Sequence, residues 1–410
     1  MVTMLGEIGL QEMVDASPIG EEKKRLGSAF FRGEHCSFNP YGKDHCKDDF
    51  ATHFILKGWL PGAPIIHRKT RVTAFGSCFA DNICTHLASI GFSTSKQENN
   101  DIYVSSMGEG LVNVYSIAQQ FKWALNGWLP PSNLWHGYDA EEYGLSEVIR
   151  LKTREVFLNT EVFILTFGLS EIWYDEITGG VFWRAVPMKH YDAGRHKFRV
   201  CTFAETKESI LDIIQLIKQP VPQAKLVMTL SPIPLIATFR QVSCITANSV
   251  SKSLLRAALD EALRELKAEI RQDVYYFPAF EIINECFPNR FVEDGRHLWP
   301  MIVPSVMRLF EATFCETNLT IDEAEQGFHK ARLQDVQTLT EHPLFSQAFK
   351  SGILPDKPEQ TGAPAGHFTM APSASIPSPV RWLKSVRAGL AVIGLSSSRR
   401  PGTQTDQQSH

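Results

Sequence analysis

Residues 71–86 read RVTAFGSCFADNICTH, and the stretch changes character at one point. A short apolar run at 72–75 ends at Gly76, Ser77 and Cys78, and a helical pattern begins directly afterwards. A strand followed at once by a helix is the unit from which parallel α/β sheets are built. Such a turn exposes short side chains and backbone N–H groups at the sheet edge. Placing a serine and a cysteine here therefore makes the turn a candidate site.

The same alternation of short apolar runs with helical periodicity continues from about 68 to 316. It predicts an α/β domain with a mostly parallel sheet. We expect buried strands at 72–75, 162–167, 225–230 and 273–277, and a weaker fifth strand near 92–95. We expect helices at about 79–90, 111–125, 209–218, 248–270 and 304–314, because apolar residues recur there at helical spacing. Gly91 stands where the first of these helices should end.

Composition divides the chain into four parts. Residues 1–65 are mixed in composition and rich in loop formers, which predicts an extension packed on the main domain. The main domain is expected at 66–316, and a helical extension is expected to follow it at 317–353. Residues 354–410 begin with a stretch rich in Pro, Ser, Ala and Gly, typical of a flexible tail. A basic segment at 381–395 within it has amphipathic spacing. It is expected either to touch an anionic membrane or a partner, or to be a marginal or disordered helix.

The bulk composition is that of a soluble globular protein. Of the 410 residues, 43% are hydrophobic and 21% charged, and the formal net charge is -4, which gives no sign of nucleic-acid binding. No apolar run is long enough to span a membrane, and the first residues lack the basic start of a signal peptide. With eight cysteines in a chain of this length, we expect reduced thiols and a cytoplasmic location.

One cluster of metal-ligating residue types lies in the N-terminal part. His35, Cys36, His45 and Cys46 form two His-Cys pairs, and all four are possible zinc ligands. Their spacing matches no standard zinc motif, so a polar loop is the favoured interpretation and a metal site is the alternative. We therefore assign neither a metal nor a cofactor.

Polar residues and turn formers follow each predicted strand. They are Gly76-Ser77-Cys78, Gly168-Leu169-Ser170-Glu171, Ser231-Pro232-Ile233-Pro234 and, further on, Glu293-Asp294-Gly295-Arg296-His297. Ligands of open parallel sheets bind at the carboxyl ends of the strands, so these stretches are expected to form one site.

Within this site, Asp294 and His297 have the spacing of an aspartate that orients a histidine. Such a histidine can accept a proton from a nucleophile. Cys78 is the stronger nucleophile candidate, because a helix N-terminus and a histidine both favour a thiolate. Ser77 stays possible, since it lies on the same turn, and a buried structural role for Cys78 is the simpler alternative.

Six ordered blocks then give the chain a recognisable signature. They are FGSCFA at 75–80, LTFGLSEIW at 165–173, LSPIPLIATF at 230–239, Asn248 with SKS at 251–253 and Arg256, YFPAFEI at 276–282, and DGRH at 294–297. Together they resemble the GSCFA family, over roughly residues 65–315.

The resemblance implies a fold similar to that of the SGNH (GDSL-like) hydrolases. This is a flavodoxin-like, three-layer α/β/α sandwich around a sheet of about five strands. It aligns Cys78 with the family's serine nucleophile, and a related acyltransferase branch uses a cysteine there. It places Asp294 and His297 in the closing block. It also places Ser170 where that superfamily has an asparagine that helps to bind the oxyanion. We expect oxyanion or substrate binding by Gly76, Gly110, Gly168, Ser170, Glu171 and Ser231.

The sequence therefore supports an acyl-ester enzyme, either an esterase or an O-acyltransferase acting on a small-molecule or carbohydrate ester. A thioester on Cys78 would pass readily to an alcohol, and an acyl-CoA or similar donor is compatible with this chemistry. Altered motif residues leave a second possibility, a binding or scaffold protein that keeps the fold without turnover. A metal-dependent enzyme using the His35–Cys46 cluster is a third.

Overall fold

The computed structural model describes residues 36–98, 101–107, 110–131 and 134–353. The chain divides into two units. Pro40–Asp335 form one unit, and Met1–Asn39 with Val336–His410 form the other. The described part of the second unit includes the short helices η5 (Leu339–Glu341) and α13 (Pro343–Lys350). The basic segment at 381–395 and His35 lie outside the described residues.

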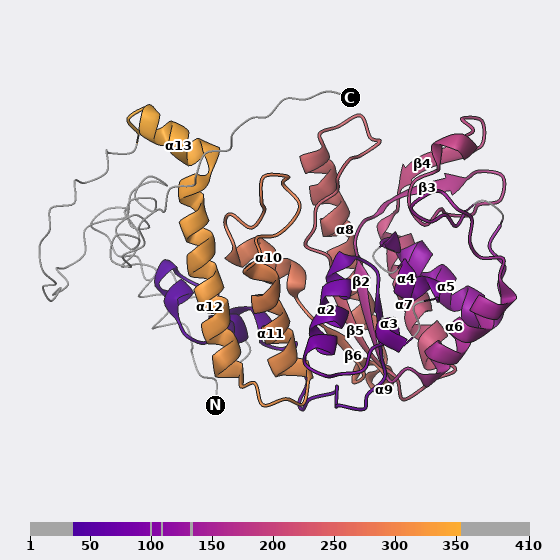
Figure 1. Ribbon diagram of the computed structural model, residues 1–410, viewed down its shortest axis with the longest axis horizontal. Helices are drawn as coiled ribbons and strands as arrows, with labels where there is room; N and C mark the ends of the chain where they lie inside the picture. The colour runs from indigo at the N-terminus through magenta and orange to yellow at the C-terminus, as the bar shows by residue number, and fades with distance from the viewer. Residues whose placement is uncertain (1–35, 99–100, 108–109, 132–133, 354–410) are drawn as a thin grey trace, which may run out of the picture. The chain divides into compact units, whose positions relative to one another are not determined.

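The large unit is built on a parallel sheet of four strands in the order β1-β2-β5-β6 (Figure 1). These are β1 (Val72–Phe75), β2 (Val162–Phe167), β5 (Lys225–Leu230) and β6 (Val274–Tyr276). Almost every residue of the strands is buried, which explains their continuous apolar sequences. The first three have the expected bounds, and the fourth is shorter than 273–277. The prediction of a fifth strand near 92–95 is wrong, because this stretch pairs with the sheet through a single isolated bridge, between Thr94 and Val72.

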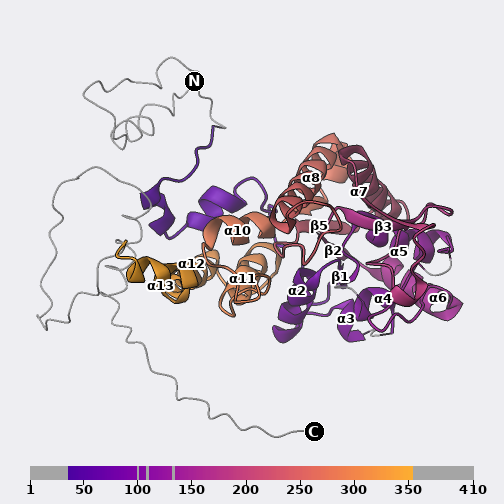
Figure 2. The same cartoon turned by 90° about the horizontal axis from the view of Figure 1, so that it is seen from above.

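Helices cover both faces of this sheet. One face carries α5 (Val114–Asn126), α6 (Glu147–Asn159), α7 (Phe203–Lys218) and α8 (Cys244–Glu265). The other carries α2 (Cys78–Ser89), α10 (Ala279–Cys286) and α11 (Ile302–Phe314), and α12 (Ile321–Thr338) packs against this helical layer. Figure 2 shows α7 and α8 on one side of the strands and α2 on the other. The unit is therefore an α/β protein with a helical layer on each face.

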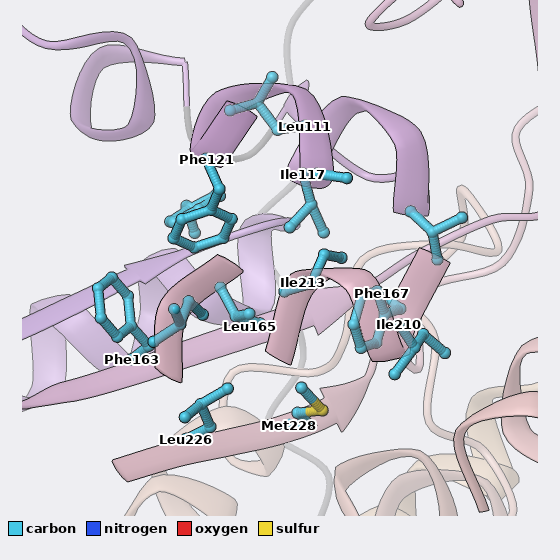
Figure 3. Close-up of a cluster of buried hydrophobic side chains, with 14 of the residues drawn as sticks. Leu111, Ile117, Phe121, Phe163, Leu165, Phe167, Ile210, Ile213, Leu226 and Met228 are labelled. Atoms are coloured by element: carbon cyan, nitrogen blue, oxygen red, sulfur yellow. The ribbon is translucent and has the colours of Figure 1, made fainter. Parts of the chain in front are cut away.

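Alternate residues of each strand supply the two cores. Figure 3 shows strand side chains meeting those of α5 and α7; the labelled ones include Phe163, Leu165, Phe167, Ile117 and Ile213. The intervening residues, such as Val162 and Ile164, belong to the core under α2 and α11. This alternation fixes the register of the strands, so the residues that follow them come out at one edge.

The remaining elements are short. A two-stranded antiparallel hairpin joins β3 (Glu171–Asp175) to β4 (His196–Val200). The other described elements are α3 (Ser95–Glu98), α4 (Tyr103–Ser106), α9 (Ala268–Arg271) and the single turns η1 (Gly42–Cys46), η2 (Thr52–Leu56) and η4 (Met188–His190). No helix within the described ranges has the length and apolar character needed to cross a membrane.

Candidate active site at the carboxyl edge of the sheet

The turn between β1 and α2 depends on Gly76. Its φ of +132° is a conformation that side-chain-bearing residues rarely adopt, and a Cβ atom there would lie 2.1 Å from the backbone oxygen of Thr166 on β2. The glycine thus lets the end of β1 lie directly against β2. It also carries the chain outward, so that α2 starts at Cys78.

Ser77 and Cys78 have different environments on this turn. Ser77 is the N-cap of α2: it is 4% exposed, and its Oγ accepts the backbone N–H of Phe79 at 3.2 Å. Cys78 is the first residue of the helix and is half-buried. The Ser77 hydroxyl therefore caps the helix, and Cys78, the more exposed of the two, is the better placed to meet a ligand.

A buried lysine reaches the same edge of the sheet from α8. The Nζ atom of Lys252 donates to the carbonyl oxygens of Gly168 at 2.7 Å and Ser231 at 2.8 Å. These residues directly follow β2 and β5, so the amine lies between the ends of the two central strands. The residue is only 3% exposed. Lys252 is the middle residue of the SKS block at 251–253, but it is not among the site residues predicted from the sequence.

The electrostatic surroundings of Lys252 connect it with the predicted site. Burial lowers its pKa to about 7, because the charged ammonium loses its hydration. The interaction with Cys78 acts in the opposite direction, and Arg296 lowers the pKa further. Lys252 therefore lies within electrostatic range of both the candidate nucleophile and the loop that contains Asp294 and His297.

Two other residues of α8 hold the loops around the site. Ser251 Oγ accepts the backbone N–H of Ser170 at 2.9 Å, and Asn248 Oδ1 accepts that of Leu235 at 3.0 Å. The hydroxyl of Ser170 is buried without a hydrogen-bond partner in the described structure. A buried hydroxyl without a partner is costly, which makes it a natural donor to a bound ligand.

Two expected oxyanion donors are already engaged. The N–H of Gly168 donates to the Val112 carbonyl at 2.7 Å, and the N–H of Gly110 donates to the Met107 carbonyl at 2.8 Å. An amide bonded within the protein is less available to a developing oxyanion, and a role of either glycine in oxyanion or substrate binding stays a prediction.

Glu171 and Ser231 contribute to the frame of the site. The two carboxylate oxygens of Glu171 accept the hydroxyl of Thr238 at 2.9 and 2.8 Å, which ties β3 to the loop after β5. Ser231 is 2% exposed, and its carbonyl is one of the two acceptors for Lys252. Both residues are thus placed to support the loops.

Asp294 and His297 lie together on a small hairpin that precedes α11. Phe291 and Leu298 form an antiparallel bridge at its base. The carboxylate of Asp294 accepts the backbone N–H groups of Arg296 and His297, each at 2.9 Å, and also bonds to Nδ1 of His297. These bonds, with that to His297 first, hold the pKa of Asp294 at about 2.

The hairpin that contains His297 is far more exposed to solvent than Lys252. The side chain of His297 is 79% exposed, whereas Arg296 is half-buried. The structure therefore brings Asp294 to His297 as expected. The approach of His297 to Cys78 stays a prediction.

An open groove of about 710 Å³ runs between α8 and α10 beside the site. Its lining includes Lys252, and most of its other residues are polar or charged: Asn248, Ser249, Ser253, Arg256, Asp260, Asn284, Glu285 and Arg290. Phe280, Ile245 and Ala257 provide its apolar surface. The groove offers many hydrogen-bonding groups to a ligand.

Four of the other cysteines are more deeply buried than Cys78. Cys84, Cys201, Cys286 and Cys315 are buried, and burial raises the pKa of each thiol to about 12. In the N-terminal cluster, His45 Nδ1 faces the guanidinium of Arg332 at 3.1 Å. Among the described residues, no three His, Cys, Asp or Glu side chains are grouped so as to hold a metal ion.

Comparison with known proteins agrees with this architecture. The family model described as the GSCFA family matches residues 71–310, more than half of the chain. None of the curated proteins matches the sequence. The matched region contains the four strands, the β1–α2 turn, Lys252 and the Asp294–His297 hairpin. The chain therefore belongs to the GSCFA family.

Proposed function

We propose that this protein is an acyl-ester enzyme, an esterase or O-acyltransferase, with Cys78 as its nucleophile. The observation that carries the proposal is the position of a half-buried thiol at the start of α2, directly after the turn that ends β1. It lies within electrostatic range of Lys252, whose amine contacts the residues that follow β2 and β5. The carboxyl edge of a parallel sheet is where such folds bind their ligands. A cationic neighbour and a helix N-terminus both favour the reactive thiolate.

The reaction has two steps. The thiolate of Cys78 attacks the ester carbonyl carbon, and the tetrahedral intermediate collapses to a thioester as the alcohol leaves with a proton from His297. An acceptor hydroxyl or water then attacks the thioester and gives its proton to His297, and Cys78 leaves as the thiolate. Asp294 orients the imidazole throughout.

Stabilisation of the oxyanion is assigned to two groups. The backbone N–H of Cys78 lies at a helix N-terminus, and the buried hydroxyl of Ser170 has no other described partner. One preorganised donor of this kind typically contributes a factor of about 100–1000 to kcat.

The polar lining of the groove between α8 and α10 supports a hydroxyl-rich acceptor. Asn248, Ser249, Ser253 and Asn284 line it beside Lys252. Such side chains can donate to and accept from sugar hydroxyls, and Phe280 offers an aromatic face. A carbohydrate is therefore the proposed acceptor class, and an acyl-CoA or a simple ester is the proposed donor class.

The proposal is tested by release of p-nitrophenol from p-nitrophenyl acetate. We expect Cys78→Ala to lower kcat/KM by at least about 100-fold, because the nucleophile is lost. His297→Ala should lower it by about 100- to 10,000-fold, the usual contribution of a positioned acid–base group. Ser77→Ala should keep most of the activity.

Cys244→Ala is the matched control, since Cys244 is also half-buried but its Sγ faces the Leu235 carbonyl at 3.7 Å. It should keep full activity. Activity that survives Cys78→Ala and is lost in Ser77→Ala would move the nucleophile to the hydroxyl. A folded wild-type protein that shows neither turnover nor an acyl adduct would support the binding or scaffold alternative.

A further inference from the structure

Lys252 is buried at the carboxyl edge of the sheet, where a charged ammonium requires a compensating interaction. Among the residues that the structure describes, the charged groups that act on Lys252 are Cys78 from α2 and Arg296 from the hairpin, and neither is a carboxylate. Its two hydrogen-bond acceptors are neutral carbonyl oxygens, of Gly168 and Ser231. Burying an ammonium among neutral groups is costly unless a negative charge compensates for it. The thiolate of Cys78 is the anion that these surroundings provide.

The bonding of the amine suits a group that gains and loses a proton. A neutral amine has two N–H groups and one lone pair, while an ammonium has three N–H groups. The carbonyls of Gly168 and Ser231 take two N–H groups in either form. The third position can then alternate between a lone pair and an N–H without any rearrangement of the two strand ends.

We propose that Lys252 accepts the thiol proton of Cys78, so that the two residues share one proton as a coupled pair. The S–H bond of Cys78 breaks, an N–H bond forms at Nζ, and the products are a thiolate and an ammonium. The total charge of the pair is unchanged, so the transfer adds no net charge to a buried site. Arg296 favours the thiolate and disfavours a second proton on the pair.

This inference rests on the proposed function, but it assigns the proton transfers to two residues, whereas a simple triad assigns them all to the histidine. Lys252 is buried and prepares the nucleophile before a substrate arrives, whereas His297 is exposed and is left to transfer protons to the leaving group and from the acceptor. The lowered pKa of Lys252, about 7, is consistent with a group that exchanges a proton near neutral pH.

The pH profile of Cys78 alkylation by iodoacetamide tests the proposal, with peptide mapping to follow each thiol. While the pair holds one proton, its thiolate fraction does not change with pH. Lys252, with a pKa of about 7, has lost its extra proton above that pH, so we expect a nearly flat alkylation rate between pH 7 and 8 in the wild-type protein and a lower rate at more acidic pH. In Lys252→Met the rate should rise about tenfold per pH unit toward the ordinary thiol pKa of about 8.5, and at pH 6.5 it should be at least about tenfold below wild type.

Lys218→Met is the matched control. Lys218 is also buried, and its Nζ donates to the Ala224 carbonyl at 3.0 Å and to the Asp273 carboxylate at 2.7 Å. These partners lie before β5 and β6, at the opposite end of the strands from Cys78. Lys218→Met should therefore leave the flat Cys78 profile unchanged. Cys244, mapped in the same samples, reports the reactivity of a half-buried thiol elsewhere.

Three results would overturn the proposal: a wild-type rate that rises tenfold between pH 7 and 8, a Lys252→Met profile as flat as wild type, or a flat profile lost in His297→Ala. If Lys252→Met does not fold, the wild-type and His297→Ala profiles still decide. Alkylation by iodoacetamide does not require ester turnover, so the two proposals can fail separately. A flat profile without ester turnover would support the Lys252–Cys78 pair and contradict the proposed enzyme activity. Ester turnover with an ordinary thiol profile would support the enzyme activity and contradict the pair.

Discussion

Gly76 is the residue that allows a thiol to stand at the edge of the sheet. Its positive φ and its contact with Thr166 mean that no side chain fits between β1 and β2 at this point. The two residues that follow separate structural and chemical roles, because Ser77 caps α2 and Cys78 begins it. The motif thus combines a close backbone contact, a helix cap and a nucleophile in three consecutive positions.

Gly76→Ala should destabilise the protein severely. The new Cβ would overlap the Thr166 backbone oxygen, which can move only if β2 moves, and the backbone would be strained as well. We expect a loss of about 3–5 kcal/mol in the free energy of unfolding, measured by urea denaturation. Gly127→Ala is the control: its φ is +69° but no atom lies within 4 Å, so it should lose only about 1 kcal/mol. Equal losses in the two variants would contradict this account.

At the residue scale, the sequence was informative where a motif is local. The pairing of Asp294 with His297 could be predicted because three residues of a tight turn separate them. Lys252 could not, because its partners Gly168 and Ser231 are distant in sequence and only the packing of α8 brings them together. The engaged amides of Gly110 and Gly168 were also hidden, since a sequence does not show where a backbone N–H points.

At the scale of elements, burial decided which predictions held. The strands β1, β2 and β5 are buried on both faces, so continuous apolar runs marked their bounds. The hairpin β3–β4 is only partly buried and contains charged residues, so no apolar pattern predicted its two strands. Helix α6 was missed because, among its residues, only Thr153 and Phe157 are buried. The second and third expected helices were found, but they begin at other residues than predicted, at Val114 and Phe203.

Helix α12 contains a carboxyl group whose burial should make stability depend on pH. Asp335 is fully buried near the C-terminal end of this helix, where the helix dipole disfavours a negative charge. Burial raises its pKa to about 6, although the Asn289 N–H and the charge of Arg290 act in the opposite direction. The folded protein therefore holds a proton between pH 4 and 6 that the unfolded chain releases, and this contribution to stability is lost as pH rises through that window.

Asp335→Asn should therefore stabilise the protein at pH 7.5, by about 1–3 kcal/mol, and have little effect near pH 4. The amide oxygen can still accept the N–H of Asn289, so the change removes mainly the charge. Urea unfolding at the two pH values measures the difference. Asp322→Asn, at an exposed position in the first turn of the same helix, should instead lower the stability at pH 7.5 by less than about 1 kcal/mol, because the helix N-terminus favours a carboxylate. A destabilised Asp335→Asn at pH 7.5 would show that the carboxylate contributes more through its interactions than burial costs.

At the scale of the whole molecule, segments outside the matched region complete the core of the large unit. Phe50, Leu56 and Ile66 are buried against the helices of the α2 and α11 layer. The buried carboxylate of Glu325 on α12 accepts the backbone N–H groups of Ala51 at 3.2 Å and Thr52 at 2.6 Å. The described part of the N-terminal region is thus fixed to the same unit that contains the site. The predicted limits of the extensions stay predictions.

The central claim is that the carboxyl edge of the sheet presents Cys78 as a covalent nucleophile. Intact mass spectrometry after brief incubation with p-nitrophenyl acetate, followed by peptide mapping, tests it most directly. The account predicts one acetyl group per chain on Cys78, absent in Cys78→Ala and formed with a normal rate in Lys218→Met. An acetyl group on Ser77, or no adduct on a folded protein that still hydrolyses the ester, would contradict it.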